Sequence, residues 1–561
     1  MKVPTWALPA FLAIALTALN AAKPVVVDDT AYLLFARQIA AHPLDPYGFE
    51  LFWYREPEPA NDILLPPVVP YWIAGGIAIF GENLVVLKLW LAPFAFSLTF
   101  AVRFLLKRFG RGSSNGALIA FVLGPAVLPL FNFMLDVPAL ALSASAVALF
   151  VRGVDRKAWI DVLFAGVLTG LAMQTKYTAF AVPIVLLGYG MLNRNAVRAV
   201  LSVAVACALF AAWESFVAFQ YGESHFLHHV RMQSSASLSL SQKLELKGQL
   251  FGPLLNHLGL LGLAAGLAVG RAVGYPRWVV LGTAILAVVG IVAICVLPYS
   301  EAVLLRSSTT NSVRLDLPGL VFRCLGIAVG TSILYATIRP LFRLAGRYLR
   351  RSPDAWFLAG WLLLEIGTYF ALTPFPAARR LVPLALPVAL IAVRWISLRV
   401  DQRPSPWIVV YTVALGLGLH ALDCWDARAE RDLAEKATAA TVDCKGTVWT
   451  QGHWGWQYYC DRAGMKLVDP GQSELKAGDC LVLPVVPDRD GFYRPFHGGA
   501  DFAIDAEALL PIAAFEADDF ISAQTIPNLY GGMVPVHGRD HARLRVVVYR
   551  VLKDWKPELR R

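Results

Sequence analysis

Charged residues are scarce in this chain, making up 16% of its 561 residues, whereas an ordinary soluble protein carries roughly 25%. This shortage excludes a soluble domain of usual composition over most of the length. Hydrophobic residues make up 57%. Apolar runs of about 20 residues, long enough to cross a bilayer, recur from Trp6 to about Leu422. The sequence therefore predicts an all-α polytopic membrane protein.

The seven cysteines include no Cys-x-x-Cys pair, so a zinc ribbon is not expected. Three lie in apolar runs, where free cysteines pack as small apolar residues. The other four lie in the tail and allow three disulfide pairings in an oxidising compartment. The sequence alone does not decide among the three pairings. We prefer the one that joins Cys444 with Cys460. The tail cysteines are Cys424, Cys444, Cys460 and Cys480.

The basic residues do not gather on one face, as nucleic-acid binding would require, although the net charge is +10. They form short clusters between apolar runs, a pattern typical of cytoplasmic loops. No nucleic-acid partner is therefore expected. The clusters are at 107–111, 152–157, 194–198, 271–277, 343–351 and 394–403.

About thirteen membrane spans fit this alternation, with every second loop basic and the N-terminus on the cytoplasmic side. Residues 5–22 are interpreted as a retained first span, because the apolar run is longer than that of a signal peptide. The expected spans are 5–22, 84–106, 115–132, 138–152, 158–175, 177–192, 197–219, 251–270, 277–298, 318–338, 354–373, 381–396 and 405–422.

The apolar segment 65–80 is not counted as a span, because counting it would place the 107–111 cluster outside. Its three prolines and its glycine pair also disfavour a regular helix. We interpret it as an interfacial helix on the outer surface. The membrane domain then covers 1–422, with a first outer loop at 23–83.

The tail 423–561 has a mixed, charged composition and is expected to form a soluble domain outside the membrane. Strand-like runs occur at 447–450, 480–486 and 544–551, and helix-like runs at 426–440 and 503–514. These patterns predict a small α+β or α/β domain that covers the outer face.

The expected outer loops bring ionisable residues from four distant parts of the chain to one membrane face. Such groups are costly at membrane depth, so each is a functional candidate. Simpler roles remain open: an acid before a helix can cap it, a lysine can extend to the headgroups, and arginines can hold anionic lipid. The candidates are Asp28, Asp29, Asp136, Lys176, Arg379 and Arg380.

Weaker candidates lie in the loop 221–250 and in the tail. His225 and His229 have a spacing that could hold a metal on one helix face, but no third ligand is evident, so no metal or other cofactor is predicted. Arg231 could contact a donor phosphate. His453, within the aromatic segment GHWGWQYYCDRAG, could contact acceptor or donor, although a domain core explains the aromatic residues equally well.

These groups suit transfer from a phosphate-linked lipid to a hydroxyl. A carboxylate can take the acceptor proton as general base, and cations stabilise the phosphate as it leaves. The bilayer would supply the lipid donor, and the outer loops would position it.

Several segments resemble one superfamily. VVVDDTAYLLFARQIA, LPPVVPYWIAGGIAIFGENLVVLKL, LDVPALAL, GLAMQTKYTAF and AARRLVPLALPVAL occur in order within residues 1–422. They resemble motifs of the glycosyltransferase-C superfamily, in the branch of the protein O-mannosyltransferases and the lipid A aminoarabinose transferases.

This resemblance implies a polyprenyl-phosphate-sugar donor and an inverting transfer, with Asp28 as base and Asp29 beside it. Asp136 matches the second acidic position, while Lys176 and Arg379 or Arg380 match positions near the donor phosphate. Two departures are Leu65, where the branch often has a basic residue, and Lys88, where arginine is usual.

We therefore expect a glycosyltransferase in the bacterial cytoplasmic membrane, with the tail domain periplasmic and an acceptor hydroxyl on lipid, glycan or protein. The alternatives are a transporter or lipid flippase, and a membrane scaffold whose outer domain binds a partner. A transporter would show internal repeats and charges deep inside the spans, and neither is evident in the sequence. A scaffold would not need acids and bases to converge.

Overall fold

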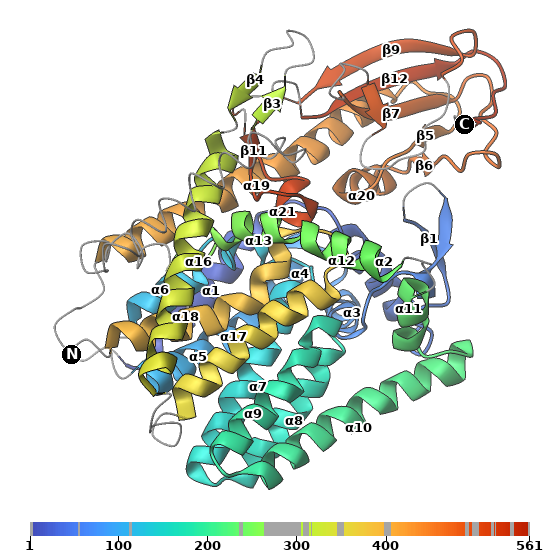
Figure 1. Cartoon of the computed structure of the whole chain (residues 1–561). Coiled ribbons are helices and arrows are strands. Elements are labelled where there is room, and N and C mark those ends of the chain that lie inside the picture. The colour runs from blue at the N-terminus through green and yellow to red at the C-terminus, as the bar shows by residue number, and fades with distance from the viewer. Residues whose placement is uncertain are drawn as a thin grey trace.

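Apolar helices form most of the chain, and a mixed β-sheet lies at one end of their bundle (Figure 1). The computed structural model describes residues 4–53, 56–110, 115–234, 239–262, 304–306, 313–315, 317–344, 353–397, 406–487, 493–495, 504–517, 521, 523–538 and 543–558. Six helices among these residues are long and apolar enough to cross a membrane. The predicted mainly helical, multi-pass fold is confirmed, whereas the count of thirteen spans stays a prediction.

The bundle helices follow the predicted apolar runs closely. They are α1 (Ala7–Ala21), α4 (Leu84–Leu89), α5 (Ala92–Gly110), α6 (Asn115–Val122), α7 (Asp136–Arg156), α8 (Trp159–Met173), α9 (Ala181–Leu192), α10 (Ala196–Tyr221), α13 (Phe251–Leu258), α16 (Leu317–Leu344), α17 (Pro353–Leu372), α18 (Val382–Ser397) and α19 (Pro406–Ala440). The expected span 277–298 and the end of the span 251–270 lie outside the described residues.

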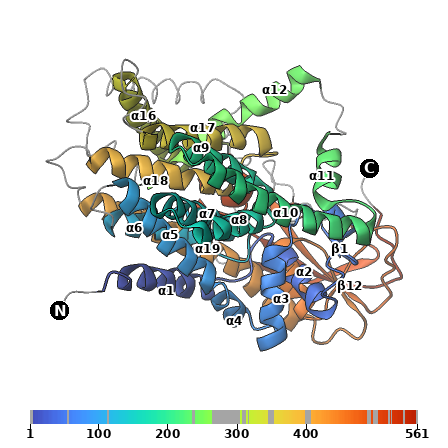
Figure 2. The same cartoon turned by 90° about the horizontal axis from the view of Figure 1, so that it is seen from below.

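Helix α7 lies inside the bundle, packed against α5 and α8 (Figure 2). The next contact, between α8 and α10, depends on small residues. A side chain at Gly166 would come within 2.5 Å of the Ser202 carbonyl oxygen. The two helices therefore approach through backbone contact, as small residues allow in membrane bundles.

Residues of three basic clusters assigned to one side, 107–111, 152–157 and 394–403, meet at one end of the bundle, whereas 271–277 and most of 343–351 lie outside the described residues. Arg108, near the end of α5, pairs with Asp155 of α7 at 2.6 Å and with Asp354 of α17 at 3.2 Å. Arg394 of α18 reaches the same Asp354 at 3.4 Å. The ends of these helices therefore meet as the predicted alternation requires.

Two expectations within the membrane region are wrong in detail. The run 115–132 is not one helix: α6 ends at Val122, and a 3₁₀ turn, η2 (Leu128–Leu130), follows. Gly124 and Pro125 interrupt it, because proline removes a backbone donor. Residues 65–80 do contain a regular helix, α3 (Val68–Phe80). Its prolines precede the helix or lie in its first turn, where proline is tolerated.

Several short elements cover the end of the bundle opposite the basic clusters. The first outer loop forms α2 (Asp29–Ala41), the hairpin β1 (Glu50–Phe52) and β2 (Pro57–Pro59), the turn η1 (Ala60–Asp62) and α3. The loop 221–250 forms α11 (His225–Ser234) and α12 (Leu240–Gln249), and the 3₁₀ turns η3 (Tyr177–Phe180) and η6 (Ala378–Leu381) precede α9 and α18. A separate hairpin pairs β3 (Leu304–Arg306) with β4 (Val313–Leu315).

The tail forms a mixed sheet with the strand order β6-β5-β7-β12-β9, and β8 pairs with β7. Strand β5 is parallel to both of its neighbours, whereas β12 is antiparallel to β7 and β9. The elements are β5 (Val448–Thr450), α20 (Trp454–Arg462), β6 (Lys466–Leu467), β7 (Cys480–Pro487), β8 (Tyr493–Pro495), β9 (Leu509–Glu516), β10 (Ala523–Gln524), α21 (Asn528–Gly531), β11 (His537–Gly538) and β12 (Arg545–Val551).

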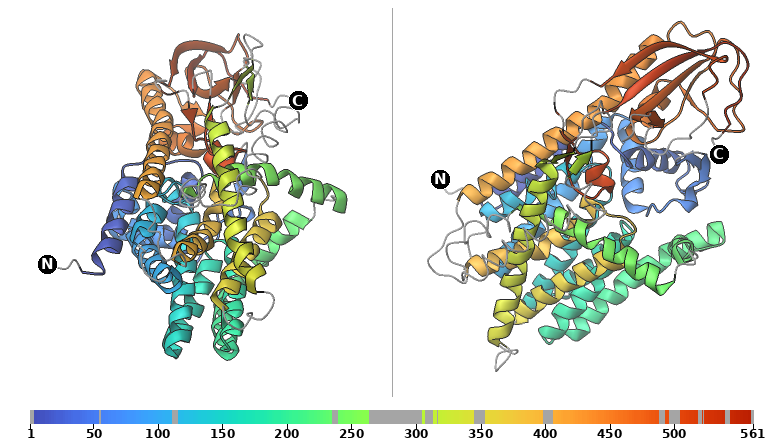
Figure 3. Two further views of the ribbon diagram at one scale, coloured as in Figure 1. Left: turned by 60° about the vertical axis from the view of Figure 1, so that its left-hand side comes forward. Right: turned by 45° about the horizontal axis from the view of Figure 1, so that its top comes forward.

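The three predicted strand regions are confirmed, but the helix expected at 503–514 is wrong. Residues 509–516 form β9 instead, because this apolar run pairs along β12 in the sheet. The helix-like run 426–440 is not separate either: α19 runs without a break from Pro406 to Ala440 and joins the bundle to the sheet (Figure 3). The division at 422 and 423 falls inside this helix and stays a prediction.

The preferred pairing of Cys444 with Cys460 is also wrong. The thiol of Cys460 is fully buried on α20, where it lies within hydrogen-bonding distance of Thr450. The thiol of Cys444 instead lies within hydrogen-bonding distance of Cys480, because Cys480 begins β7 next to the turn that carries Cys444.

Candidate active site

Asp28 ends a short strained loop between α1 and α2. Val27 before it has a φ of 47°, a conformation that a β-branched residue adopts at a cost of about 1–3 kcal/mol. Asp28 occupies the N-cap position of α2, but its side chain makes no capping hydrogen bond. Its carboxylate instead accepts a hydrogen bond from Arg379 Nη1 at 2.7 Å. The simple capping role therefore does not account for Asp28.

Asp29 points away from this contact and is fully buried. One carboxylate oxygen accepts the Val26 amide at 3.3 Å. Burial raises the pKa of Asp29 to about 6, against the attraction of Lys88 and Lys23. The position of Asp29 suits holding the loop in place better than touching a substrate.

Asp136 and Lys176 form a second ion pair, between the first turn of α7 and the turn after α8. Burial lowers the pKa of Lys176 to about 8, and the charge of Asp136 opposes this shift. The side chain of Lys176 is 14% exposed, so Lys176 is held by the protein rather than extended to headgroups.

Arg379 and Arg380 lie side by side in η6 but have different partners. Burial opposes the charge of Arg379, yet Asp28 and Asp136 raise its pKa above the ordinary value. Arg380 forms no ion pair with any described residue; its guanidinium lies 5.1 Å from the ring centre of Phe375. Burial and the neighbouring Arg379 lower the pKa of Arg380 to about 10. Arg380 is thus a half-buried cation that forms no direct ion pair with a carboxylate of the described residues.

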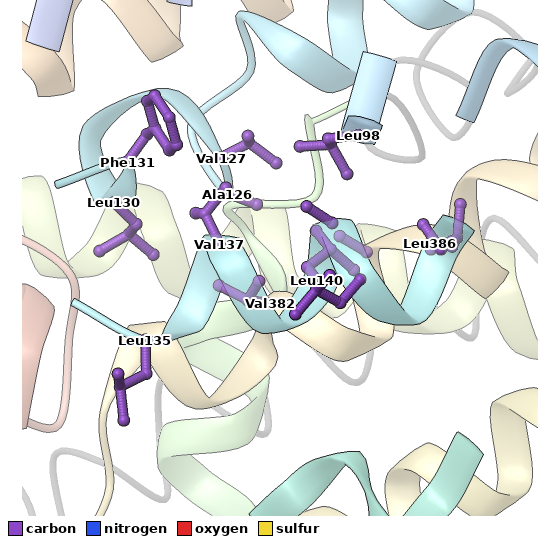
Figure 4. Close-up of a cluster of buried hydrophobic side chains, with 14 of the residues drawn as sticks. Leu98, Ala126, Val127, Leu130, Phe131, Leu135, Val137, Leu140, Val382 and Leu386 are labelled. Atoms are coloured by element: carbon purple, nitrogen blue, oxygen red, sulfur yellow. The ribbon is translucent and has the colours of Figure 1, made fainter. Parts of the chain in front are cut away.

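Buried apolar side chains next to Asp136 and the arginine pair hold these charged residues in position. Leu135 and Val137 flank Asp136, and Val382 and Leu386 follow the arginine pair; all four belong to one buried cluster that also includes Phe131 (Figure 4). Because buried clusters are close-packed, the segment that carries Asp136 and the segment that carries the arginine pair are held in one arrangement. The sequence prediction that distant charges meet at one end of the bundle agrees with this geometry.

The outer domain contributes His453 to the same region. His453 precedes α20 and is buried, with Nδ1 lying 3.0 Å from Gln457 Oε1. Its ring lies edge-on to Trp53 at 4.9 Å. Burial lowers the pKa of His453, and the nearby charge of Asp28 acts in the opposite direction. The start of α2, next to Asp28, is also tied to this region, because the Thr30 hydroxyl donates to the Trp454 carbonyl at 2.6 Å.

Arg231 is not brought into this cluster. Its side chain on α11 is 72% exposed and pairs with Glu223 at 2.7 Å. His225 and His229 do share one face of α11, with 3.2 Å between their Nε2 atoms. Among the described residues, however, no three His, Cys, Asp or Glu side chains gather as a metal site would require.

Sequence reasoning missed several buried charges. Lys23 pairs with Asp423 and donates to the Tyr530 hydroxyl at 2.8 Å, which ties α1 to α19 and α21. Lys88 donates to the carbonyls of Lys23 and Pro24 and so supports the loop that carries Asp28. The position of Lys23, between an apolar run and Asp28, was the available signal.

Several acids, Glu214 and Glu365 among them, also lie inside predicted spans, where none was recognised. Glu214 of α10 accepts hydrogen bonds from Gln174 at 3.1 Å and Ser224 at 2.7 Å. Glu365 of α17 accepts one from Trp361 at 3.0 Å. Glu365 lines a cavity of about 30 Å³ together with Asp136 and Lys176, which is room for about one water molecule.

The fold and the site define a multi-pass membrane protein with an acid–base pocket at one end of its bundle. Residues 65–216 match the family of the dolichyl-phosphate-mannose-protein mannosyltransferases. This match confirms the resemblance inferred from the sequence motifs, namely that the chain is similar to the mannosyltransferase-like branch of the glycosyltransferase-C superfamily. No curated protein sequence matches the chain.

Solved structures with a similar arrangement include the oligosaccharyltransferase AglB of Archaeoglobus fulgidus in complex with an inhibitory peptide and a dolichol-phosphate. It is 14% identical, with a TM-score of 0.47 over 82% of this chain and 63% of that one. The present chain thus spans under two thirds of that protein's length. ArnT of Cupriavidus metallidurans in the apo state is 16% identical, with a TM-score of 0.38 over 83% of this chain and 86% of that one.

Proposed function

We propose that this protein is an integral-membrane glycosyltransferase that moves a sugar from a polyprenyl-phosphate donor to an acceptor hydroxyl. Asp28 accepts the hydroxyl proton as the oxygen attacks the anomeric carbon from the face opposite the phosphate. The bond from that carbon to the phosphate oxygen breaks, so the transfer inverts the anomeric configuration. The family name attached to residues 65–216 supports a donor of the polyprenyl-phosphate class.

The guanidinium of Arg380, which forms no ion pair with a described residue, is the observation that carries this proposal. Asp28 is paired with Arg379 and Asp136 with Lys176, so Arg380 is the pocket cation that forms no ion pair with a described residue. A phosphodiester donor carries one negative charge and would neutralise it. Because buried charges are costly unless they are paired, the pocket around Arg380 is suited to an anion.

The cations of the pocket also stabilise the phosphate product of the transfer. When the sugar leaves, the donor becomes a phosphate monoester, whose charge at neutral pH is about −1.5 to −2. Lys176, Arg379 and Arg380 stabilise the charge that develops, as preorganised cations do at a leaving phosphate. Asp136 holds Lys176 for this role, and Asp29 together with Lys88 keeps the strained loop in place.

The orientation of the protein follows from its loops. Under the positive-inside rule, the end with Arg108 and Arg394 faces the cytoplasm, as does the N-terminus. Asp28, Arg380 and the outer domain then face the periplasm of a bacterial cell. The donor would enter from the lipid of the outer leaflet.

Replacing Asp28 by Asn tests the chemistry. General-base catalysis contributes about 10²–10⁴-fold, so kcat for the Asp28→Asn protein should fall by that factor. Donor affinity should not weaken, because the change removes a negative charge beside the phosphate. The assay follows release of polyprenyl phosphate from a panel of radiolabelled polyprenyl-phosphate sugars, with the protein in lipid nanodiscs and membrane extract as the acceptor source.

Asp443→Asn is the matched control, because Asp443 is exposed on the outer domain and its replacement should leave turnover unchanged. Full activity of the Asp28→Asn protein would exclude Asp28 as the base. Mass spectrometry of glycolipids and glycoproteins, from cells with and without the gene, would identify the sugar and the acceptor.

A further inference from the structure

A large cleft lies between the first outer loop and the outer domain, beside the pocket described above. Its volume is about 590 Å³, within the range of about 300–1,000 Å³ typical of small-molecule sites. Its lining residues come from helix α2, the β1 strand and α20, three elements that lie near one another in Figure 1. Neither Asp28 nor the arginine pair lines it.

The cleft combines aromatic rings with hydrogen-bonding side chains. Phe49 and Phe52 supply half-buried rings and Gln38 supplies an amide, while Tyr458 and Gln457 line the cleft but are almost fully buried. Sugar rings present C–H faces to aromatic residues and hydroxyl edges to polar groups. A pocket of aromatic surface with a few placed polar groups suits such a ligand.

The charge of the cleft argues against a phosphate-bearing ligand. Arg37 is the one Lys or Arg among the described residues that line it. Its guanidinium is already held by Glu82, at 2.7 and 2.8 Å, and by Asp461 at 2.8 Å. Glu50 adds a further carboxylate to the wall. With more acids than bases, the cleft favours uncharged, hydroxyl-rich molecules over lipid phosphates.

The inner end of the cleft approaches Asp28. Thr30, two residues after Asp28, lines the cleft, and so does Gln457. Gln457 contacts His453, and the charge of Asp28 acts on His453. His453 therefore contacts a residue of the cleft wall and lies near enough to Asp28 for that charge to act on it.

We propose that this cleft binds the acceptor, and that the acceptor is an uncharged oligosaccharide whose terminal hydroxyl reaches Asp28. This inference rests on the proposed function, because it names the substrate that the Asp28 pocket would glycosylate. The bond formed would join the donor sugar to that hydroxyl, and the hydroxyl proton would pass to Asp28.

Saturation-transfer NMR tests the cleft without the donor. The probes are three neutral tetrasaccharides, of mannose, glucose and N-acetylglucosamine, mixed with the full-length protein in lipid nanodiscs. Ala41→Trp is the main variant, because Ala41 is exposed at the end of α2 and lines the cleft, so an indole there would fill it. Leu44→Trp is the control, because Leu44 is 76% exposed and lies outside the cleft lining.

We expect saturation of at least one tetrasaccharide with the unmodified protein and with Leu44→Trp, and an affinity at least tenfold weaker with Ala41→Trp. Absence of saturation with every tetrasaccharide, or equal affinity in both tryptophan variants, would overturn the cleft assignment. A hydrophilic peptide that binds the cleft while the sugars do not would overturn the glycan class.

The two proposals fail in different ways. Donor turnover that depends on Asp28, without tetrasaccharide binding, would refute the cleft and leave the glycosyltransferase. Tetrasaccharide binding without turnover of any polyprenyl-phosphate sugar would refute the proposed function. Arg380→Met provides a cross-check, because it should weaken donor binding and leave tetrasaccharide binding intact.

Discussion

The two adjacent arginines should respond to replacement in opposite ways. Arg379 is paired with Asp28, whereas Arg380 forms no ion pair with a described residue and lies beside the ring of Phe375. Methionine at either position keeps much of the side-chain length and removes the charge. Arg379→Met should therefore unfold more easily, and Arg380→Met should bind donor poorly while remaining well folded.

The magnitudes follow from the environment of each residue. Breaking a buried ion pair costs about 3–5 kcal/mol, which is the loss of stability expected for Arg379→Met. The pKa of Arg380 is lowered to about 10, so its charge costs the folded protein about 3 kcal/mol. Removing that charge forfeits a cation–π contact of about 1–2 kcal/mol. Arg380→Met should thus be as stable as the unmodified protein or more so.

Donor affinity, in contrast to stability, should depend strongly on Arg380. Losing one buried partner of a charged pair costs about 2–5 kcal/mol. The dissociation constant of Arg380→Met for a polyprenyl-phosphate sugar should therefore rise by about 30- to 5,000-fold. Isothermal calorimetry in nanodiscs measures the affinity, and scanning fluorimetry gives Tm for both variants. An Arg380→Met protein that loses as much stability as Arg379→Met, or binds donor normally, would refute the reasoning.

Three further predictions concern other groups. As pH rises through about 8, Lys176 loses its proton, so kcat/KM for donor should fall, whereas the Lys176→Arg protein should keep a high kcat/KM. The free energy of unfolding should rise over the same pH range, because the unfolded chain then binds more protons than the folded protein. Lys23→Met should lower stability by about 3–5 kcal/mol, and adding Asp423→Asn should restore most of it in thermal unfolding. Protein isolated from an oxidising compartment should carry a Cys444–Cys480 disulfide, seen as a linked peptide in non-reducing mass spectrometry; free thiols at both positions would contradict this.

The helices were predictable because each depends on the composition of its own segment. The meeting of the outer charges was predictable because it depends on the count of spans and basic loops along the chain. Apolar length marks a helix, and alternating basic loops determine which ends lie together. Asp28, Asp136 and Arg379 could therefore be assigned to one face without any knowledge of the packing.

The remaining details depend on contacts between distant residues. Nothing local distinguishes Arg379 from Arg380, because only the position of Asp28 decides which is paired. Residues 509–516 are apolar enough for either a helix or a strand, and β12 decides the outcome. The role of Lys23 likewise depends on Asp423, about 400 residues away.

The continuity of α19 has a consequence for how the outer domain can vary. A helix of 35 residues is about 52 Å long and turns by about 100° with each residue. The domain is therefore joined to the bundle by a rigid rod rather than by a flexible tether. A single inserted residue in this rod would swing α20 and His453 around its axis, so domain exchange between related proteins requires matching helical phase as well as matching length.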